Sequence, residues 1–132
     1  MRVCIVLSIA LLASCANETR HFRGVDPVRL TVDGSSFDIR LRGNLAETVR
    51  VNPQYAPRLG PLRIQAGFAM AQVSGCRVTG LLGDQAVMTG VLDCSTVTQL
   101  PVVPEYSCVD VVLWLQDRAH AGGAEYTCSP VH

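Results

Sequence analysis

The chain has 132 residues with 11 basic and 11 acidic side chains, so its net charge is zero at pH 7 when histidine is neutral. This balance argues against a nucleic-acid-binding protein, because surfaces that bind nucleic acid carry a clear excess of basic residues. The length suits one domain with its own core and is too short for two ordinary domains. We therefore expect a single small domain.

The start of the chain has the organisation of a bacterial export signal. Arg2 precedes an apolar run over residues 3–12, and the run leads into the sequence Leu12-Ala13-Ser14-Cys15. The apolar run is roughly half as long as a membrane-spanning helix, so we interpret it as a signal rather than as an anchor helix. An ordinary secretory site has a small residue three positions before the cut. Cleavage before Cys15 would place Leu12 there, which argues against an ordinary secretory signal.

This motif resembles the lipobox of bacterial lipoproteins, in which an aliphatic residue and two small residues precede a cysteine. The resemblance implies transfer of diacylglycerol to Cys15, cleavage before it, and acylation of its new amino group with a fatty acid such as palmitate. Because Ala16 and not aspartate follows, the resemblance also implies an outer-membrane lipoprotein that faces the periplasm. We expect a signal peptide over residues 1–14, a lipidated polar tether over residues 15–26 and a folded domain over residues 27–132.

The exported part of the chain carries further cysteines that predict disulfide bonds. They are Cys76, Cys94, Cys108 and Cys128. An even number of cysteines outside the cytoplasm is typical of disulfides, and their long spacing does not match a metal or redox motif. Spacing alone leaves the connectivity open, and strand register is needed to choose a pairing.

Residues 76–94 consist of two alternating runs around a Gly83-Asp84 turn, which predicts a β hairpin. If Cys76 faces Cys94, apolar residues share one face and Arg77 faces Asp93 on the other. The other pairs in this register are Val78 with Leu92, Thr79 with Val91, Gly80 with Gly90, and Leu82 with Met88. This consistent register favours a disulfide between Cys76 and Cys94.

The two remaining cysteines are expected to close a second hairpin. Residues 106–116 are rich in β-branched and aromatic side chains, which favour a strand, and a glycine pair further on allows the chain to return. The strand partners are then Cys108 with Cys128 and Asp110 with Tyr126. A helix over residues 105–121 fits part of the same pattern, and this alternative stays open.

Residues 28–41 predict another β hairpin, with a loop over residues 33–36. Apolar residues then lie opposite each other on one face. The pairs are Val32 with Phe37, Leu30 with Ile39, and Val28 with Leu41. On the other face, Thr31 lies opposite Asp38 and Arg29 opposite Arg40, and the arginine pair is unfavourable. The dipeptide Gly43-Asn44 then predicts a turn into a third strand near residues 48–51.

A helix is predicted to begin at Pro61 and to end before Gly75. Its apolar stripe consists of Leu62, Ala66, Ala69, Met70 and Val73. The strands need a cover on one face, and this helix is the natural one. Gly67 weakens the helix, so we expect it to mark close packing against the sheet.

The predicted order is a hairpin, a third strand, a helix and two disulfide-closed hairpins. This order indicates an α+β fold, a small single domain of antiparallel β hairpins packed with one helix and held by two disulfides. The helix, the Ser74-Gly75-Cys76 junction, the Gly83-Asp84 turn and the Leu92-Asp93-Cys94 end resemble small uncharacterised envelope lipoproteins of alphaproteobacteria. The resemblance covers residues 61–94 and implies export and a common scaffold, with no catalytic residues.

The chain contains no nucleophile elbow, zinc-protease motif, phosphate-binding glycine loop or calcium loop. We therefore expect no enzyme, no metal and no cofactor. Three aromatic residues, Tyr106, Trp114 and Tyr126, are candidates either for a binding patch on the last hairpin or for core positions. We expect a non-catalytic envelope lipoprotein that binds an envelope protein or a cell-wall polymer. The alternative is an inhibitor of a periplasmic or invading hydrolase, because small disulfide-bonded domains present preorganised loops.

Overall fold

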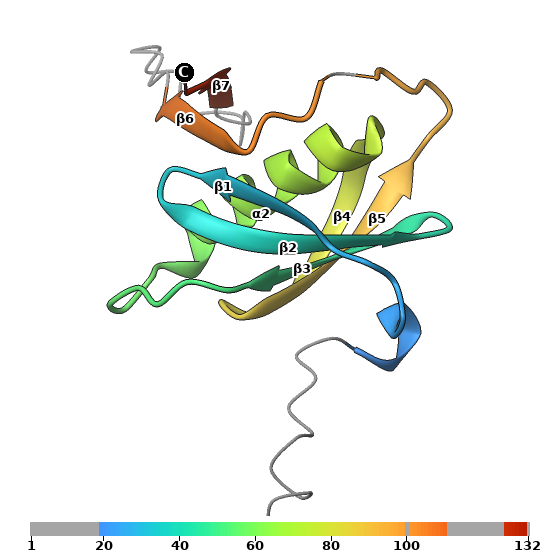
Figure 1. The fold of residues 1–132 in the computed structure, drawn as a ribbon, viewed down its shortest axis with the longest axis horizontal. Coiled ribbons are helices and arrows are strands. Elements are labelled where there is room, and N and C mark those ends of the chain that lie inside the picture. The colour runs from blue at the N-terminus through green and yellow to red at the C-terminus, as the bar shows by residue number, and fades with distance from the viewer. Residues whose placement is uncertain (1–18, 100, 111–125, 132) are drawn as a thin grey trace, which may run out of the picture.

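The computed structural model describes residues 19–99, 101–110 and 126–131. These residues form a seven-stranded sheet in the order β4-β5-β3-β2-β1-β6-β7, with helix α2 packed across β1 to β5 (Figure 1). The elements are η1 (Arg20–Phe22), β1 (Val28–Val32), β2 (Ser35–Arg42), β3 (Leu45–Arg50), α2 (Leu59–Ser74), β4 (Arg77–Gly83), β5 (Val87–Asp93), β6 (Glu105–Asp110) and β7 (Tyr126–Pro130). Among the strands that the structure describes, only β1 and β6 pair in parallel. A mostly antiparallel sheet with one long helix and two disulfides confirms the α+β fold class.

The β1–β2 hairpin forms where the sequence predicts it, but its register differs by two residues. Leu30 pairs with Phe37, not with Ile39. The predicted four-residue loop is wrong, because the turn consists of Asp33 and Gly34 alone, with φ of 47° and 75°. Positive φ at both positions is typical of the tight turns that match the twist of paired strands.

This shift keeps the same residues facing the core and removes the unfavourable arginine pair. Arg29 lies opposite Asp38, and the Arg29 Nε atom is 2.7 Å from Asp38 Oδ1. The turn at Gly43-Asn44 leads into β3 as expected, although the strand spans Leu45–Arg50 and so begins earlier than predicted.

The β4–β5 hairpin has the predicted register at its open end. Arg77 pairs with Asp93 and Val78 with Leu92, and the Cys76–Cys94 disulfide is present. A β-bulge between Val78 and Gly80 then shifts the strand by one residue. The predicted pairs of Gly80 with Gly90 and Leu82 with Met88 are therefore wrong, and Thr79, which was predicted opposite Val91, is the extra residue of the bulge and shares Val91 with Gly80.

The shift in register is explained by packing against α2. Leu81 pairs with Gly90 and lies next to Met70, whereas Leu82 turns away from the helix and is 75% exposed. A one-residue slip exchanges the two faces of a strand, so the bulge decides which leucine enters the core.

The last hairpin confirms the second disulfide, with Cys108 opposite Cys128 and Asp110 opposite Tyr126. The chain is a strand over Glu105–Asp110, which contradicts the helical alternative for this part. Residues 111–125, where the rest of that alternative falls, lie outside the described residues. The hairpin joins the sheet through β6, which pairs with β1 at Thr31 and Val32.

Helix α2 begins at Leu59, two residues before the predicted Pro61, and ends as expected at Gly75. Gly75 has φ of 69° and its N–H donates to the carbonyl of Ala71 at 2.8 Å, which is a left-handed helix end that favours glycine. The predicted close packing of Gly67 is wrong, because a Cβ atom there would meet nothing within 4 Å. The close approach to the sheet occurs instead at Gly90.

The segment before β1 packs on the sheet face opposite α2, although we predicted residues 15–26 as a tether. The Thr19 N–H and hydroxyl donate to the fully buried carboxylate of Glu47 at 3.0 and 2.9 Å. Phe22 is only 1% exposed, and Arg40 Nε donates to the carbonyl of Val25 at 3.1 Å. The packed domain therefore includes residues from Thr19 onward, because this sheet face also needs a cover.

No helix among residues 19–99, 101–110 and 126–131 is long and apolar enough to cross a membrane.

Candidate functional site

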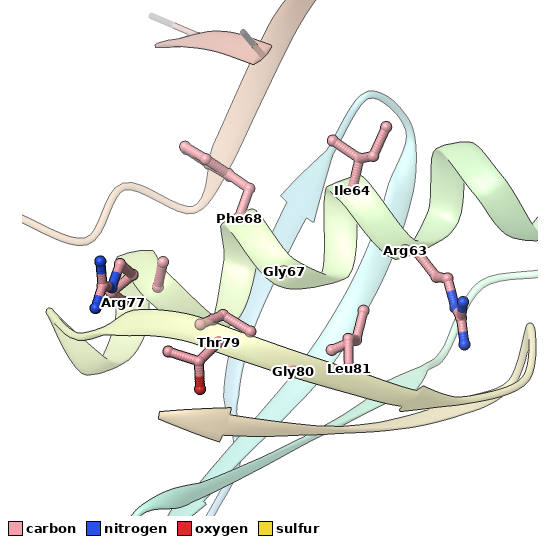
Figure 2. A pocket seen from close by; sticks show the side chains of 10 residues that line it. Arg63, Ile64, Gly67, Phe68, Arg77, Thr79, Gly80 and Leu81 are labelled. Atoms are coloured by element: carbon pink, nitrogen blue, oxygen red, sulfur yellow. The ribbon is translucent and has the colours of Figure 1, made fainter. Parts of the chain in front are cut away.

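An open groove of about 550 Å³ runs between α2 and the edge strand β4 (Figure 2). The helix contributes Arg63, Ile64, Gly67, Phe68 and Ala71, and the strand contributes Arg77, Val78, Thr79, Gly80 and Leu81. The groove exists because α2 crosses the sheet at the β4 edge, where no further strand is paired among the described residues. Its two walls are therefore the flank of a helix and the last strand of the sheet.

The helix wall is apolar because α2 carries a second apolar stripe beside the buried one. Ile64, Phe68 and Ala71 recur at the i, i+4, i+7 spacing of one helix face. Ile64 is 43% exposed, and the ring of Phe68 packs edge-on against Tyr106 with centroids 5.2 Å apart. Gly67 lies in this stripe and leaves the middle of the groove open (Figure 2).

The strand wall is formed by the residues around the bulge. Val78 and Leu81 are half-buried and line the groove, with Leu81 directed toward α2 in Figure 2. The Thr79 hydroxyl donates to the carbonyl of Val91 at 3.3 Å across the hairpin. The bulge thus shapes the groove as well as the core.

An arginine lies toward each end of the groove (Figure 2). The Arg77 guanidinium is 2.6 Å from Asp93 Oδ2, yet its side chain is 76% exposed. Hydrogen bonds from the backbone and side chain of Ser95, together with Arg77, lower the pKa of Asp93 to about 2. Arg63 is exposed and forms no ion pair within the described part of the chain. No acidic side chain lines the groove, and its positive charge comes mainly from Arg63, because Arg77 is already paired with Asp93.

This arrangement suits binding rather than bond-breaking chemistry. An apolar floor holds apolar side chains, and guanidinium groups bind carboxylates or phosphates. The lining residues include no histidine, cysteine or carboxylate that would serve as a nucleophile or general base. Across the described ranges, no group of three or more His, Cys, Asp or Glu side chains has the geometry to hold a metal ion.

Of the three residues of the predicted aromatic patch, Tyr106 is the one whose side chain falls in the described part of the chain. Tyr106 is 5% exposed and belongs to the core, where its hydroxyl accepts from the Val103 N–H at 3.2 Å and donates to the Pro101 carbonyl at 3.3 Å. Trp114 lies outside the described residues, and for Tyr126 only the backbone in β7 is described. Tyr106 thus takes the core position, which is one of the two roles that the sequence allowed.

The predicted lipid-attachment residue, Cys15, also lies outside the described residues. The groove was not predicted from the sequence. The feature that could have indicated it is the second apolar stripe of the helix, which contains Gly67 and lies beside the stripe that covers the sheet.

No protein-family model matches this chain, and no curated protein or solved structure shows significant similarity to it. The resemblance to envelope lipoproteins therefore stays a prediction from the sequence.

Proposed function

We propose that the protein is a non-catalytic, lipid-anchored envelope protein that binds another envelope component through the groove between α2 and β4. The observation that carries this proposal is an apolar groove of about 550 Å³ with an arginine toward each end. Exposed apolar surfaces that are rimmed by polar groups mark interaction sites in soluble domains. The anchor is Cys15, and the expected location is the periplasmic side of the outer membrane.

The packing of the N-terminal segment supports a role close to the membrane. Thr19 is four residues after Cys15 in the chain, and its backbone is held by the buried carboxylate of Glu47. Four extended residues span at most about 14 Å. A lipid on Cys15 would therefore keep the domain next to the bilayer surface, so a partner in or on the same membrane is favoured.

The proposal is tested by filling the groove without unfolding the domain. Replacing Gly67 with leucine places a side chain in the open space of the groove, and it improves helix propensity by about 0.6–1 kcal/mol. Gly60 is the matched control, because it also lies in α2 with open space around its Cβ position but does not line the groove. Gly67→Leu should be at least as stable as the wild type. Gly60→Leu places a Cβ next to the Pro61 ring, so the two variants are compared at equal folded fraction.

The assay is crosslinking of the tagged protein in intact cells, followed by identification of the captured partner. The wild type and Gly60→Leu should capture the same partner, whereas Gly67→Leu should lose it. A Cys15→Ala variant separates partners of the anchored protein from background. Equal capture by Gly67→Leu and Gly60→Leu, or no partner above the Cys15→Ala background, would contradict the proposal.

A second candidate function, inhibition of a hydrolase, is favoured by the tip of the β4–β5 hairpin. Leu82 projects from this hairpin, and the Asp84 carboxylate accepts hydrogen bonds from the N–H groups of Ala86 and Val87 at 2.8 and 3.0 Å. These bonds keep the loop in one conformation, which lowers the entropic cost of binding. Inhibition of a captured hydrolase that is lost in Leu82→Ser, and retained in Gly67→Leu, would support this function over the groove.

A further inference from the structure

Strand β4 is an edge of the sheet, and this edge lies beside the groove. It pairs with β5 alone, so within the described ranges no strand pairs with its outer side. Edge strands are commonly blocked by proline, by inward-pointing charges or by a bulge. In β4 the bulge and Arg77 lie at one end, and the residues from Gly80 to Gly83 include neither proline nor a charged residue.

A strand added to this edge would place its side chains against the outer flank of α2. Side chains alternate between the two faces of a sheet, so every second side chain of an added strand would lie on the α2 side. Ile64 and Phe68 line the groove on that side, and Gly67 leaves room between them. The groove thus offers apolar contacts to alternate side chains, while the edge of β4 offers backbone donors and acceptors.

The charges of the groove indicate which strand would bind. Arg63 and Arg77 lie toward its two ends, and no acidic side chain lines it. An acyl chain would use the apolar floor but not the backbone groups of β4. A peptide would use both, and one of its carboxylates would complement Arg63, because Arg77 is already paired with Asp93.

We propose that β4 and the groove together bind an extended peptide segment that has alternating apolar side chains and at least one carboxylate. This inference rests on the proposed function, because it names the class of partner that the groove takes. The bound segment becomes an additional strand at the β4 edge, and its apolar side chains lie under Ile64 and Phe68.

The test measures binding of a short fluorescent peptide to the full-length protein in detergent micelles, by fluorescence anisotropy. The peptide alternates valine and threonine and carries an aspartate at each end. Methylation of alternate backbone nitrogens should weaken binding about tenfold or more, because it removes the donors that pair with β4. Replacement of both aspartates with asparagine should weaken binding about two- to fivefold. In an Arg63→Gln variant, the difference in affinity between the aspartate peptide and the asparagine peptide should be smaller.

The protein variants give a second readout. Gly67→Leu should lose peptide binding, and Gly60→Leu should bind like the wild type. The inference would be overturned if the methylated peptide binds as tightly as the unmethylated one, or if no peptide of this pattern binds. It would also be overturned if the protein forms a dimer that Gly67→Leu abolishes, because the groove would then bind a second copy of the chain. If peptides fail while capture in cells still depends on Gly67, the proposed function stands and strand addition is wrong. If peptides bind as expected and cells yield no partner, the proposed function fails instead.

Discussion

Replacing Gly90 with alanine tests the close approach of α2 to the sheet. Gly90 is buried in β5 opposite Leu81, and an added Cβ would overlap Met70 Sδ and lie 3.3 Å from Met70 Cε and 3.4 Å from Leu81 Cδ1. Met70 is fully buried in the core, so its flexible side chain has little free space into which it can move. The backbone of Gly90 does not have positive φ, and the effect of the substitution is therefore one of packing.

The expected magnitude follows from two opposing terms. Overpacking of a core costs about 1–3 kcal/mol. Alanine recovers about 0.5–1 kcal/mol of the backbone entropy that glycine loses in a strand. Because buried Met70 has little room to move, the overpacking cost lies in the upper part of this range, about 2–3 kcal/mol. The net loss is then about 1–2.5 kcal/mol, which lowers Tm by about 4–10 °C in a domain of this size.

The assay is urea unfolding of the oxidised protein, followed by circular dichroism. Gly80→Ala is the control, because a Cβ there would meet only Val91 atoms, the nearer at 3.9 Å, which is ordinary contact. The variant Met70→Ala leaves a cavity, and the new methyl of Gly90→Ala should enter it. The decrease in the free energy of unfolding of the double variant should therefore be smaller, by at least about 1 kcal/mol, than the sum of the decreases in the two single variants. Wild-type stability of Gly90→Ala, or strict additivity in the double variant, would refute this account of the packing.

The remaining predictions concern the N-terminal clamp, one ionisation and one disulfide. Glu47→Ala removes the acceptor of the Thr19 hydrogen bonds, which form the N-terminal clamp, and should lower the free energy of unfolding by about 1–3 kcal/mol. Trypsin should then cleave faster after the arginines of the N-terminal segment. Unchanged cleavage would argue against the clamp. The Asp93 carboxyl should titrate near pH 2 by NMR, below its ordinary value of 3.8. Because the folded pKa is lowered, Asp93 stabilises the fold above its unfolded pKa, and the advantage of the wild type over Asp93→Asn should vanish as the pH falls from about 4 to about 2. Joint replacement of Cys76 and Cys94 by alanine should cost about 3 kcal/mol, and alkylation of either cysteine in the oxidised wild type would disprove the bridge.

Local patterns in the sequence predicted the structure correctly where several of them indicated the same feature. The disulfide between Cys76 and Cys94 was predicted because the apolar alternation and the Arg77–Asp93 pair required the same register. The end of α2 was predicted because a left-handed helix end favours glycine, and Gly75 adopts φ of 69° there.

Alternation alone did not determine register in the other hairpins. A shift of two residues leaves every side chain on the same face, so the pattern of β1 and β2 did not distinguish the predicted loop from the Asp33-Gly34 turn. The turn dipeptide itself carried the missing signal. The bulge in β4 had no such local signal, because it follows from the fit of Leu81 against Gly90 and the helix.

The sequence by itself determined the apolar faces of β1, β2 and α2, the two cysteine pairs and the expectation of an exported, anchored domain, whereas the bulge reversed the predicted face in the second half of β4. Only the tertiary structure decided that residues from Thr19 onward pack on the sheet and that β4 is an edge. The groove depends on both kinds of information, because the stripe of Ile64 and Phe68 is local while its position beside an open edge is not. Periodicity records which face of each element is apolar. Strand order depends on the free energy of contacts between residues far apart in the chain, and no local pattern contains that energy.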